Sequence, residues 1–155
     1  MQKLIMGIGI PGSGKTTFLK ALAHAKNYIY ISPDDIREKL LGDAADQSKD
    51  REVWVQAKRE LTKRGADGKT VVFDATFSLK KDRKNFISFA RTCGFKKIEG
   101  IFFNVPLAVA MKRNAGRARN VSQNVMERMH QNLLQSPPVL EEGFDVVRVK
   151  EFFSQ

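Results

Sequence analysis

Short apolar runs recur along the chain and alternate with longer stretches of helical periodicity. Runs such as Leu4-Ile5-Met6 and Ile101-Phe102-Phe103 are continuously apolar, which is typical of strands buried on both faces. Five strands are predicted, over residues 4–10, 28–31, 70–73, 98–105 and 146–149. Strands that alternate with helices predict an α/β fold in three layers, with a mainly parallel five-stranded sheet and helices on both faces.

Apolar positions spaced three or four residues apart predict the helices between these strands. Helices are expected over residues 15–26, 49–64, 80–92 and 107–114, and a last one is expected after Ser122. The second of these carries Val53, Ala57 and Leu61 at four-residue spacing and is expected to stop at Gly65. Ser122 is a suitable N-cap for the last helix.

The length and composition fit one globular domain over residues 1–155. Cys93 is the one cysteine, which excludes an intrachain disulfide and fits a reducing compartment. No apolar run approaches the roughly 20 residues that span a bilayer, and the first residues lack a signal-peptide pattern. A soluble, cytoplasmic protein with no membrane partner is therefore expected.

Positive charge is concentrated in the middle of the chain. The net charge is +10, and residues 58–135 hold 17 basic and 6 acidic side chains, whereas the remainder is nearly neutral. Such a region favours polyanionic ligands, nucleic acid or a nucleotide among them. A solvated basic face, with arginines that serve only a nucleotide, explains the same pattern.

Residues 9–16 match the phosphate-binding motif G-x-x-x-x-G-K-S/T at every fixed position, between a predicted strand and a predicted helix. Glycines allow successive backbone N–H groups to point at phosphate oxygens, and the helix N-terminus adds its positive dipole. Lys15 is expected to reach the β- and γ-phosphates of ATP, and the Thr16 hydroxyl is expected to bind Mg²⁺. The expected nucleotide-binding residues of this segment are Gly12, Ser13, Gly14, Lys15, Thr16 and Thr17.

Val71-Val72-Phe73-Asp74 resembles a Walker B strand that ends in a carboxylate. Asp74 is therefore placed near the magnesium ion, directly or through water, or in the acceptor cleft. Ala75 follows instead of the glutamate that motor ATPases use, and the chain has no Asn-Lys-x-Asp guanine-binding motif. A phosphotransferase remains as the favoured class.

The predicted second strand leads into Ser32-Pro33-Asp34-Asp35-Ile36-Arg37. Ligands of parallel sheets bind beyond the carboxyl ends of the strands, so Asp34 is a candidate base for an acceptor hydroxyl. Arg37 lies one helical turn further on and is a candidate ligand for a substrate phosphate. Helix capping by Ser32, with Asp34 and Asp35 in the first turn, accounts for the same residues equally well.

Four segments together resemble the phage-type 5′-hydroxyl polynucleotide kinases, within the wider group of small P-loop kinases. They are Gly-Ile-Pro-Gly-Ser-Gly-Lys-Thr, Ser-Pro-Asp-Asp-Ile-Arg, Val-Phe-Asp-Ala-Thr and Lys-Arg-Asn-Ala-Gly-Arg-Ala-Arg. The resemblance spans nearly the whole chain and covers the kinase portion of such enzymes. It implies an ATP- and Mg²⁺-dependent kinase that acts on 5′-hydroxyl ends of RNA or DNA, in the host cytoplasm if a phage encodes it.

The resemblance also implies roles for individual residues. Asp34 would be the general base, and Arg37 would hold the acceptor's 3′-phosphate. Asp74 and Thr76 would lie in the acceptor cleft. The resemblance places three arginines over the nucleotide: Arg113 against it, Arg117 in a lid over the transferring phosphoryl group, and Arg119 as a second lid candidate. Phe77 stands where the family often has asparagine, and Pro33 where a polar residue is common, which leaves the acceptor open.

Two other functions fit the motifs. A small-molecule kinase for a nucleoside, a sugar or a zeta-toxin-like substrate would use the same ATP-binding residues, and a non-catalytic nucleotide-dependent binding module would need only the P-loop. The sequence leaves open the choice between RNA and DNA and the oligomeric state.

Trp54 is able to stack on a base, although its neighbours Val53 and Val55 favour a packing role. The basic run at residues 80–84 fits either phosphate contacts or a solvated helix face.

Overall fold

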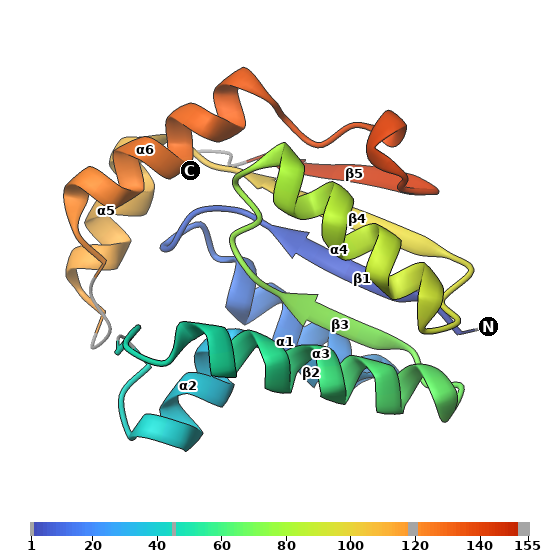
Figure 1. Ribbon diagram of the computed structural model, residues 1–155. Coiled ribbons are helices and arrows are strands. Elements are labelled where there is room, and N and C mark those ends of the chain that lie inside the picture. Colours follow the sequence, from blue (N-terminus) through green and yellow to red (C-terminus); the bar gives the residue numbers. More distant parts are fainter. Residues whose placement is uncertain (1, 45, 118–120, 152–155) are drawn as a thin grey trace.

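The computed structural model describes residues 2–44, 46–117 and 121–151, and its strands form one parallel sheet in the order β2-β3-β1-β4-β5 (Figure 1). The strand bounds are β1 Leu4–Ile8, β2 Ile29–Ile31, β3 Val71–Asp74, β4 Ile98–Asn104 and β5 Val146–Glu151. The prediction of five parallel strands is confirmed. The first strand ends two residues earlier than predicted, because the chain leaves the sheet at Gly9 to form the phosphate-binding loop.

The helices are α1 Lys15–Lys26, α2 Pro33–Leu41, α3 Asp50–Ala66, α4 Lys80–Thr92, α5 Leu107–Ala115 and α6 Gln123–Gln135, with a short 3₁₀ helix, η1 Leu140–Glu142. The predicted bounds of α1 and α4 are confirmed, and Ser122 caps α6 by accepting a hydrogen bond from Val125 N. The prediction that α3 stops at Gly65 is wrong. Gly65 lies inside the helix, where a Cβ would approach the Cys93 carbonyl oxygen to 2.4 Å, so this glycine permits close packing.

Helices cover both faces of the sheet, as predicted. On one face, α1 packs Leu19 and Ala23 against Ile5, Val72 and Ile101. On the other face, which is toward the viewer in Figure 1, α3, α4 and α6 enclose the larger core. That core includes Phe73, Phe86, Leu61, Met126 and Ile98.

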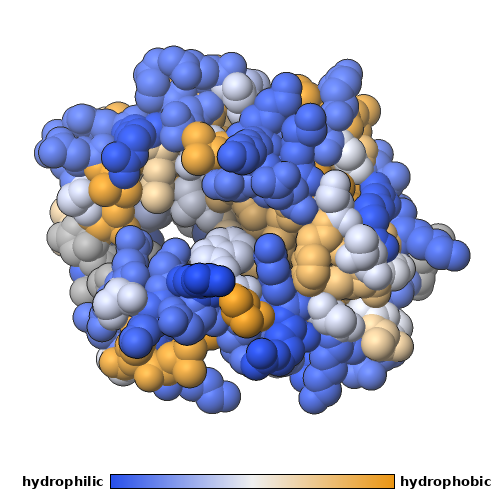
Figure 2. Space-filling view, in the orientation of Figure 1, coloured by the Kyte–Doolittle hydropathy of each residue, from blue (hydrophilic) through white to orange (hydrophobic). Residues whose placement is uncertain are grey.

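The register of the strands brings the phosphate-binding motif after β1 and Asp74 at the end of β3 to the same edge of the sheet. Gly7 of β1 pairs with Asp74 of β3, and Ile31 of β2 pairs with Phe73. The loops after β1, β2 and β3 therefore meet beyond the carboxyl ends of the strands. Figure 2 shows a hollow between the part formed by α5 and α6 and the part formed by α2 and α3. Within the described residues, every helix is too short or too polar to cross a lipid bilayer.

Candidate active site

The loop between β1 and α1 is shaped by two glycines in the left-handed region. Gly12 has φ of 83° and Gly14 has φ of 86°, conformations that other residues adopt only with strain. A Cβ on Gly12 would lie 2.2 Å from the Ala110 carbonyl oxygen, so the loop packs directly on the backbone of α5. Gly9 N donates a 3.1 Å hydrogen bond to the Thr76 carbonyl oxygen, which ties the loop to the segment after β3.

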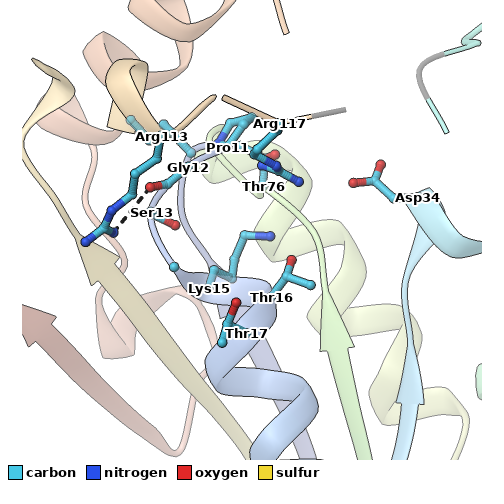
Figure 3. Close-up of a pocket in the computed structure, with 12 residues that line it drawn as sticks. Pro11, Gly12, Ser13, Lys15, Thr16, Thr17, Asp34, Thr76, Arg113 and Arg117 are labelled. Carbon is cyan, nitrogen blue, oxygen red and sulfur yellow. Dashed lines mark hydrogen bonds between the residues drawn. The ribbon is translucent and has the colours of Figure 1, made fainter. Parts of the chain in front are cut away.

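A cavity of about 300 Å³ lies over this loop. Figure 3 shows the Asp34 carboxylate facing the loop from the start of α2, with Arg117 and Thr76 between them. The structure thus brings together, around one space, most of the residues that the sequence singles out: Gly12, Ser13, Gly14, Lys15, Thr16, Thr17, Asp34, Thr76, Arg113 and Arg117. Arg37 and Asp74 lie behind this lining and contact it, and Arg119 lies outside the described residues.

Asp74 accepts hydrogen bonds from three side chains at the base of the cavity. Lys15 Nζ donates to Oδ1, Thr16 Oγ1 donates to Oδ2 at 2.7 Å, and the Tyr30 hydroxyl donates to Oδ2 at 2.5 Å. Burial alone would raise the pKa of this carboxyl, but the charge of Lys15 and the three hydrogen bonds outweigh it and lower the pKa below its ordinary value. Asp74 is thus held as a carboxylate.

Tyr30 is a site residue that the sequence motifs do not indicate. Burial, followed by the charge of Asp74, raises the pKa of Tyr30 well above its ordinary value, so its hydroxyl remains a donor. The position of Tyr30 depends on the pairing of β2 with β3, which sets Tyr30 opposite Val72, two residues before Asp74. The sequence signal was the alternation of tyrosine and isoleucine over residues 28–31, but the sheet order was needed to interpret it.

Arg37 links the candidate base to α3. Its Nη1 donates to Asp34 Oδ1 at 2.7 Å and its Nη2 donates to Asp50 Oδ1 at 2.5 Å. The Arg37 side chain is only 5% exposed, whereas the Asp34 side chain is 40% exposed. Asp34 therefore has one oxygen held by a buried cation while the residue lines the cavity. Asp50 is the second residue of the site that the sequence did not indicate.

The two described arginines of the predicted lid region occupy different places. Arg113 in α5 donates from Nη1 to the Gly12 carbonyl oxygen at 3.4 Å and lies over the phosphate-binding loop, with its guanidinium directed away from Asp34 (Figure 3). Arg117 follows α5 and lines the cavity on the side of Asp34. The buried Asn114 side chain donates from Nδ2 to the Val121 carbonyl oxygen at 2.7 Å and accepts from Val121 N at 3.1 Å, so it closes the segment that carries Arg117.

The residues present fit a nucleotide with its metal ion. The Ser13 hydroxyl is buried and has no hydrogen-bond partner among the described residues, although it lines the cavity. The Thr16 hydroxyl and the Asp74 carboxylate adjoin, and both are oxygen ligands of the kind that Mg²⁺ prefers. The described part of the chain contains no cluster of three His, Cys, Asp or Glu side chains suited to a metal. Magnesium sites commonly use one or two protein oxygens together with substrate phosphates.

A buried ion pair supports the loop after β3. Arg83 and Glu142 have fully buried side chains and form a bidentate pair, with distances of 2.6 and 2.8 Å. Arg83 also donates to the Phe77 carbonyl oxygen at 2.9 Å, at a residue with φ of 47°. The interpretation of residues 80–84 as an exposed basic run is therefore wrong for Arg83, because this side chain turns inward to hold the segment that contains Thr76.

Comparison with known proteins supplies a family and a fold. A family model described as an AAA domain matches residues 4–137 of this chain. The structure is similar to that of a protein from Chloroflexus aurantiacus described as a candidate kinase, with 17% identity, a TM-score of 0.73, and 97% of this chain and 88% of that chain covered. The arrangement of one parallel sheet between helices is therefore the P-loop kinase fold.

Two further solved structures have the same fold. A chain in the Pnkp1/Rnl/Hen1 RNA repair complex is 21% identical, with a TM-score of 0.78, and the match covers 93% of this chain but only 46% of that chain. A sugar kinase from Janibacter sp. is 18% identical, with a TM-score of 0.64, and the match covers 97% of this chain and 86% of that chain. At these identities the likeness concerns the fold alone.

Proposed function

Because this chain belongs to the AAA domain family and has the P-loop kinase fold, we propose that it is an ATP-dependent kinase that phosphorylates the 5′-hydroxyl end of RNA or DNA. The observation that carries the proposal is the position of Asp34, which lines the same cavity as Lys15, Thr16 and Arg117. A nucleotide-binding module has no need of a carboxylate opposite its phosphate loop, whereas a kinase needs a base there.

In this proposal the phosphate loop binds ATP through its backbone N–H groups, Lys15 Nζ and the Ser13 hydroxyl. Thr16 and Asp74 hold Mg²⁺, directly or through water, and the bound ion supplies positive charge to the phosphates. Arg117 stabilises the charge on the transferring phosphoryl group, and Arg113 lies against the nucleotide. Thr76 lies on the acceptor side of the cavity.

Asp34 accepts the proton of the acceptor hydroxyl during transfer. The acceptor oxygen then forms a bond to the γ-phosphorus while the bond from that phosphorus to the bridging oxygen breaks, and ADP departs. Arg37 holds Asp34 Oδ1 at 2.7 Å, which fixes the orientation of this carboxyl beside the cavity. Arg37 would also hold the acceptor's 3′-phosphate, as the resemblance to polynucleotide kinases implies.

A polynucleotide acceptor is favoured by the excess of basic residues between positions 58 and 135 and by the likeness to a chain of an RNA repair complex. A small-molecule kinase is the second candidate. It is favoured by the burial of Arg37 between two aspartates, which opposes a phosphate contact, and by the likeness to a sugar kinase.

A label-transfer assay separates the two candidates. The protein is incubated with γ-labelled ATP, Mg²⁺ and a 5′-hydroxyl oligonucleotide, and in parallel with sugars and nucleosides. The same oligonucleotide with a 5′-phosphate is the matched control, since it offers no 5′-hydroxyl. We expect label only in the 5′-hydroxyl oligonucleotide, with a KM that rises steeply with salt. Efficient labelling of a small acceptor, with none in the oligonucleotide, would establish the second candidate instead.

A further inference from the structure

A second cavity adjoins the first at Thr76, which lines both. Its volume is about 430 Å³, within the roughly 300–1,000 Å³ that small-molecule sites occupy. Its lining comes from α3, α4, α6 and the loop after β3, the elements that enclose the larger core in Figure 1. A group attached to a hydroxyl in the first cavity would therefore extend past Thr76 into the second.

Trp54 forms an aromatic wall of this second cavity. Its ring packs at centroid distances of 5.8 Å from Phe73, 6.2 Å from Phe77 and 6.3 Å from Phe86. The Phe rings are buried, whereas Trp54 stays partly exposed and lines the cavity. A tryptophan fixed by three aromatic neighbours and still accessible is a rigid surface on which a planar ring can stack at little entropic cost.

The polar groups of the second cavity suit an uncharged ring better than an anion. Among the described residues of its lining, the charged side chains are Lys58 and Asp82, whose charges cancel. Asn85 on α4 adds an exposed amide to the rim, and an amide both donates and accepts hydrogen bonds, as the edge of a nucleobase does. Met129 on α6 adds a flexible apolar side chain. Among the described residues of this lining, phosphate groups would find no cluster of cations.

Resting on the proposed function, we propose that this cavity binds the base of the acceptor's 5′-terminal nucleotide. Trp54 stacks on the base, Asn85 contacts its edge, and Thr76 lies at the junction between the base and the reacting hydroxyl. The base must leave any stack within the polynucleotide to enter the cavity, so the site selects unpaired ends. Base–aromatic stacking is tolerant of sequence, and we expect little discrimination among the four bases.

Fluorescence tests the proposal directly, because Trp54 is the one tryptophan of the chain. A short single-stranded 5′-hydroxyl oligonucleotide is titrated into the protein without ATP, and its matched control has an abasic 5′-terminal nucleotide. We expect the first to change the tryptophan emission and the second to bind about tenfold or more weakly without that change. Equal affinities and equal emission changes would overturn the proposal.

Variants then separate a base contact from a packing role. Trp54→Leu keeps an apolar side chain but removes the aromatic face, and we expect it to raise the KM of the base-bearing oligonucleotide about tenfold while the abasic substrate is unaffected. Trp54→Phe keeps an aromatic face, and we expect its KM for the base-bearing oligonucleotide to stay close to that of the wild type. Val55→Ala, at the neighbouring and 49% exposed position of α3, is the control and keeps the wild-type KM. If Trp54→Leu impairs both substrates equally, Trp54 serves packing alone and the proposal is wrong.

Label transfer to base-bearing and abasic oligonucleotides distinguishes failure of this inference from failure of the proposed function. If the wild-type protein labels base-bearing and abasic ends with equal kcat/KM, the polynucleotide kinase stands and the base site is overturned. If it labels neither oligonucleotide but labels a sugar, the polynucleotide kinase is overturned and the base site with it.

Discussion

Asp74 shows at the scale of single residues how the site is held in place. It is 3% exposed, and a buried carboxylate is costly unless its oxygens are paired. Lys15, Thr16 and Tyr30 satisfy it from three different segments of the chain. The same contacts orient Lys15 and Thr16, the two side chains that the phosphate-loop motif assigns to the nucleotide and its metal.

The lowered pKa of Asp74 predicts a loss of stability in acid. The folded-state pKa lies below the ordinary value of 3.8, so the unfolded chain takes up a proton first as the pH falls. The stabilisation is complete well above pH 4 and disappears as the pH falls through the folded-state pKa. Urea denaturation of the wild type and of Asp74→Asn at pH 6 and pH 3 measures it. We expect the difference in the free energy of unfolding between the wild type and Asp74→Asn to be smaller at pH 3 than at pH 6. A difference independent of pH would contradict a lowered pKa for Asp74.

Motifs identify residues whose chemistry is fixed by near neighbours in sequence, and they fail for residues that meet through the sheet. Lys15, Thr16 and Asp34 were predicted because a local pattern surrounds each of them. Tyr30 and Asp50 carry no such pattern, since their contacts with Asp74 and Arg37 span 44 and 13 residues. Their assignment required the strand order and the packing of α3.

At the scale of elements, the N-terminus of α2 resolves the two interpretations of its first turn. Ser32 Oγ accepts a hydrogen bond from Asp35 N at 3.4 Å, and Pro33 begins the helix, so the capping prediction is confirmed. The cap is supplied by Ser32, which leaves the carboxylate of Asp34 to Arg37 and the cavity. Capping and a catalytic role for Asp34 are therefore compatible.

The side-chain amide of Asn114 joins the end of α5 to Val121, just before α6, and its removal has a predictable effect. Asn114→Ala removes two hydrogen bonds to Val121 that close the segment carrying Arg117. We expect kcat to fall about tenfold, because Arg117 would act on the transferring group in the proposed mechanism, with little change in ATP affinity. Steady-state kinetics with ATP titration measure both quantities.

Asn124→Ala is the matched control for this prediction, since Asn124 is exposed at the start of α6. A fall in ATP affinity with kcat unchanged would show that the link serves nucleotide binding instead. Equal kcat and equal ATP affinity in the two variants would show that the hydrogen bonds of Asn114 affect neither quantity.

At the scale of the whole molecule, the pair of Arg83 and Glu142 joins distant parts of the chain. Arg83 lies in α4, Glu142 lies in η1, and Arg83 also donates to the Ser136 carbonyl oxygen at 2.7 Å beyond the end of α6. Both side chains are fully buried. Removing one partner of such a pair leaves an uncompensated buried charge.

We predict that Arg83→Met and Glu142→Leu each lower the free energy of unfolding by about 3–5 kcal/mol. The double variant should be less destabilised than the sum of the two, because no buried charge remains unpaired. Denaturation by urea measures all three against Lys84→Met, a control at the neighbouring exposed position. A double variant with the full summed loss would show that the two side chains are not coupled and would contradict this prediction.

The general architecture was accessible from the sequence because buried parallel strands and amphipathic helices leave periodic patterns. The five strands, the two faces and the place of the phosphate loop are all confirmed. The sheet order was not predicted, and the second cavity depends on it, because α3, α4 and α6 meet there only after the strands between them are arranged. Arg83 was predicted to be exposed because it lies in a run of charged residues, and its burial likewise follows only from the packing of distant elements.

The most direct test of the account is the transfer rate of Asp34→Asn, measured beside its affinity for ATP. The control is Asp35→Asn, since Asp35 has a 52% exposed side chain and lies outside the lining of the first cavity. We predict that Asp34→Asn lowers the rate of 5′-phosphorylation by about 10²-fold or more while ATP binding is retained, and that Asp35→Asn stays near the wild type. Near-normal turnover by Asp34→Asn would contradict the assignment of Asp34 as the base.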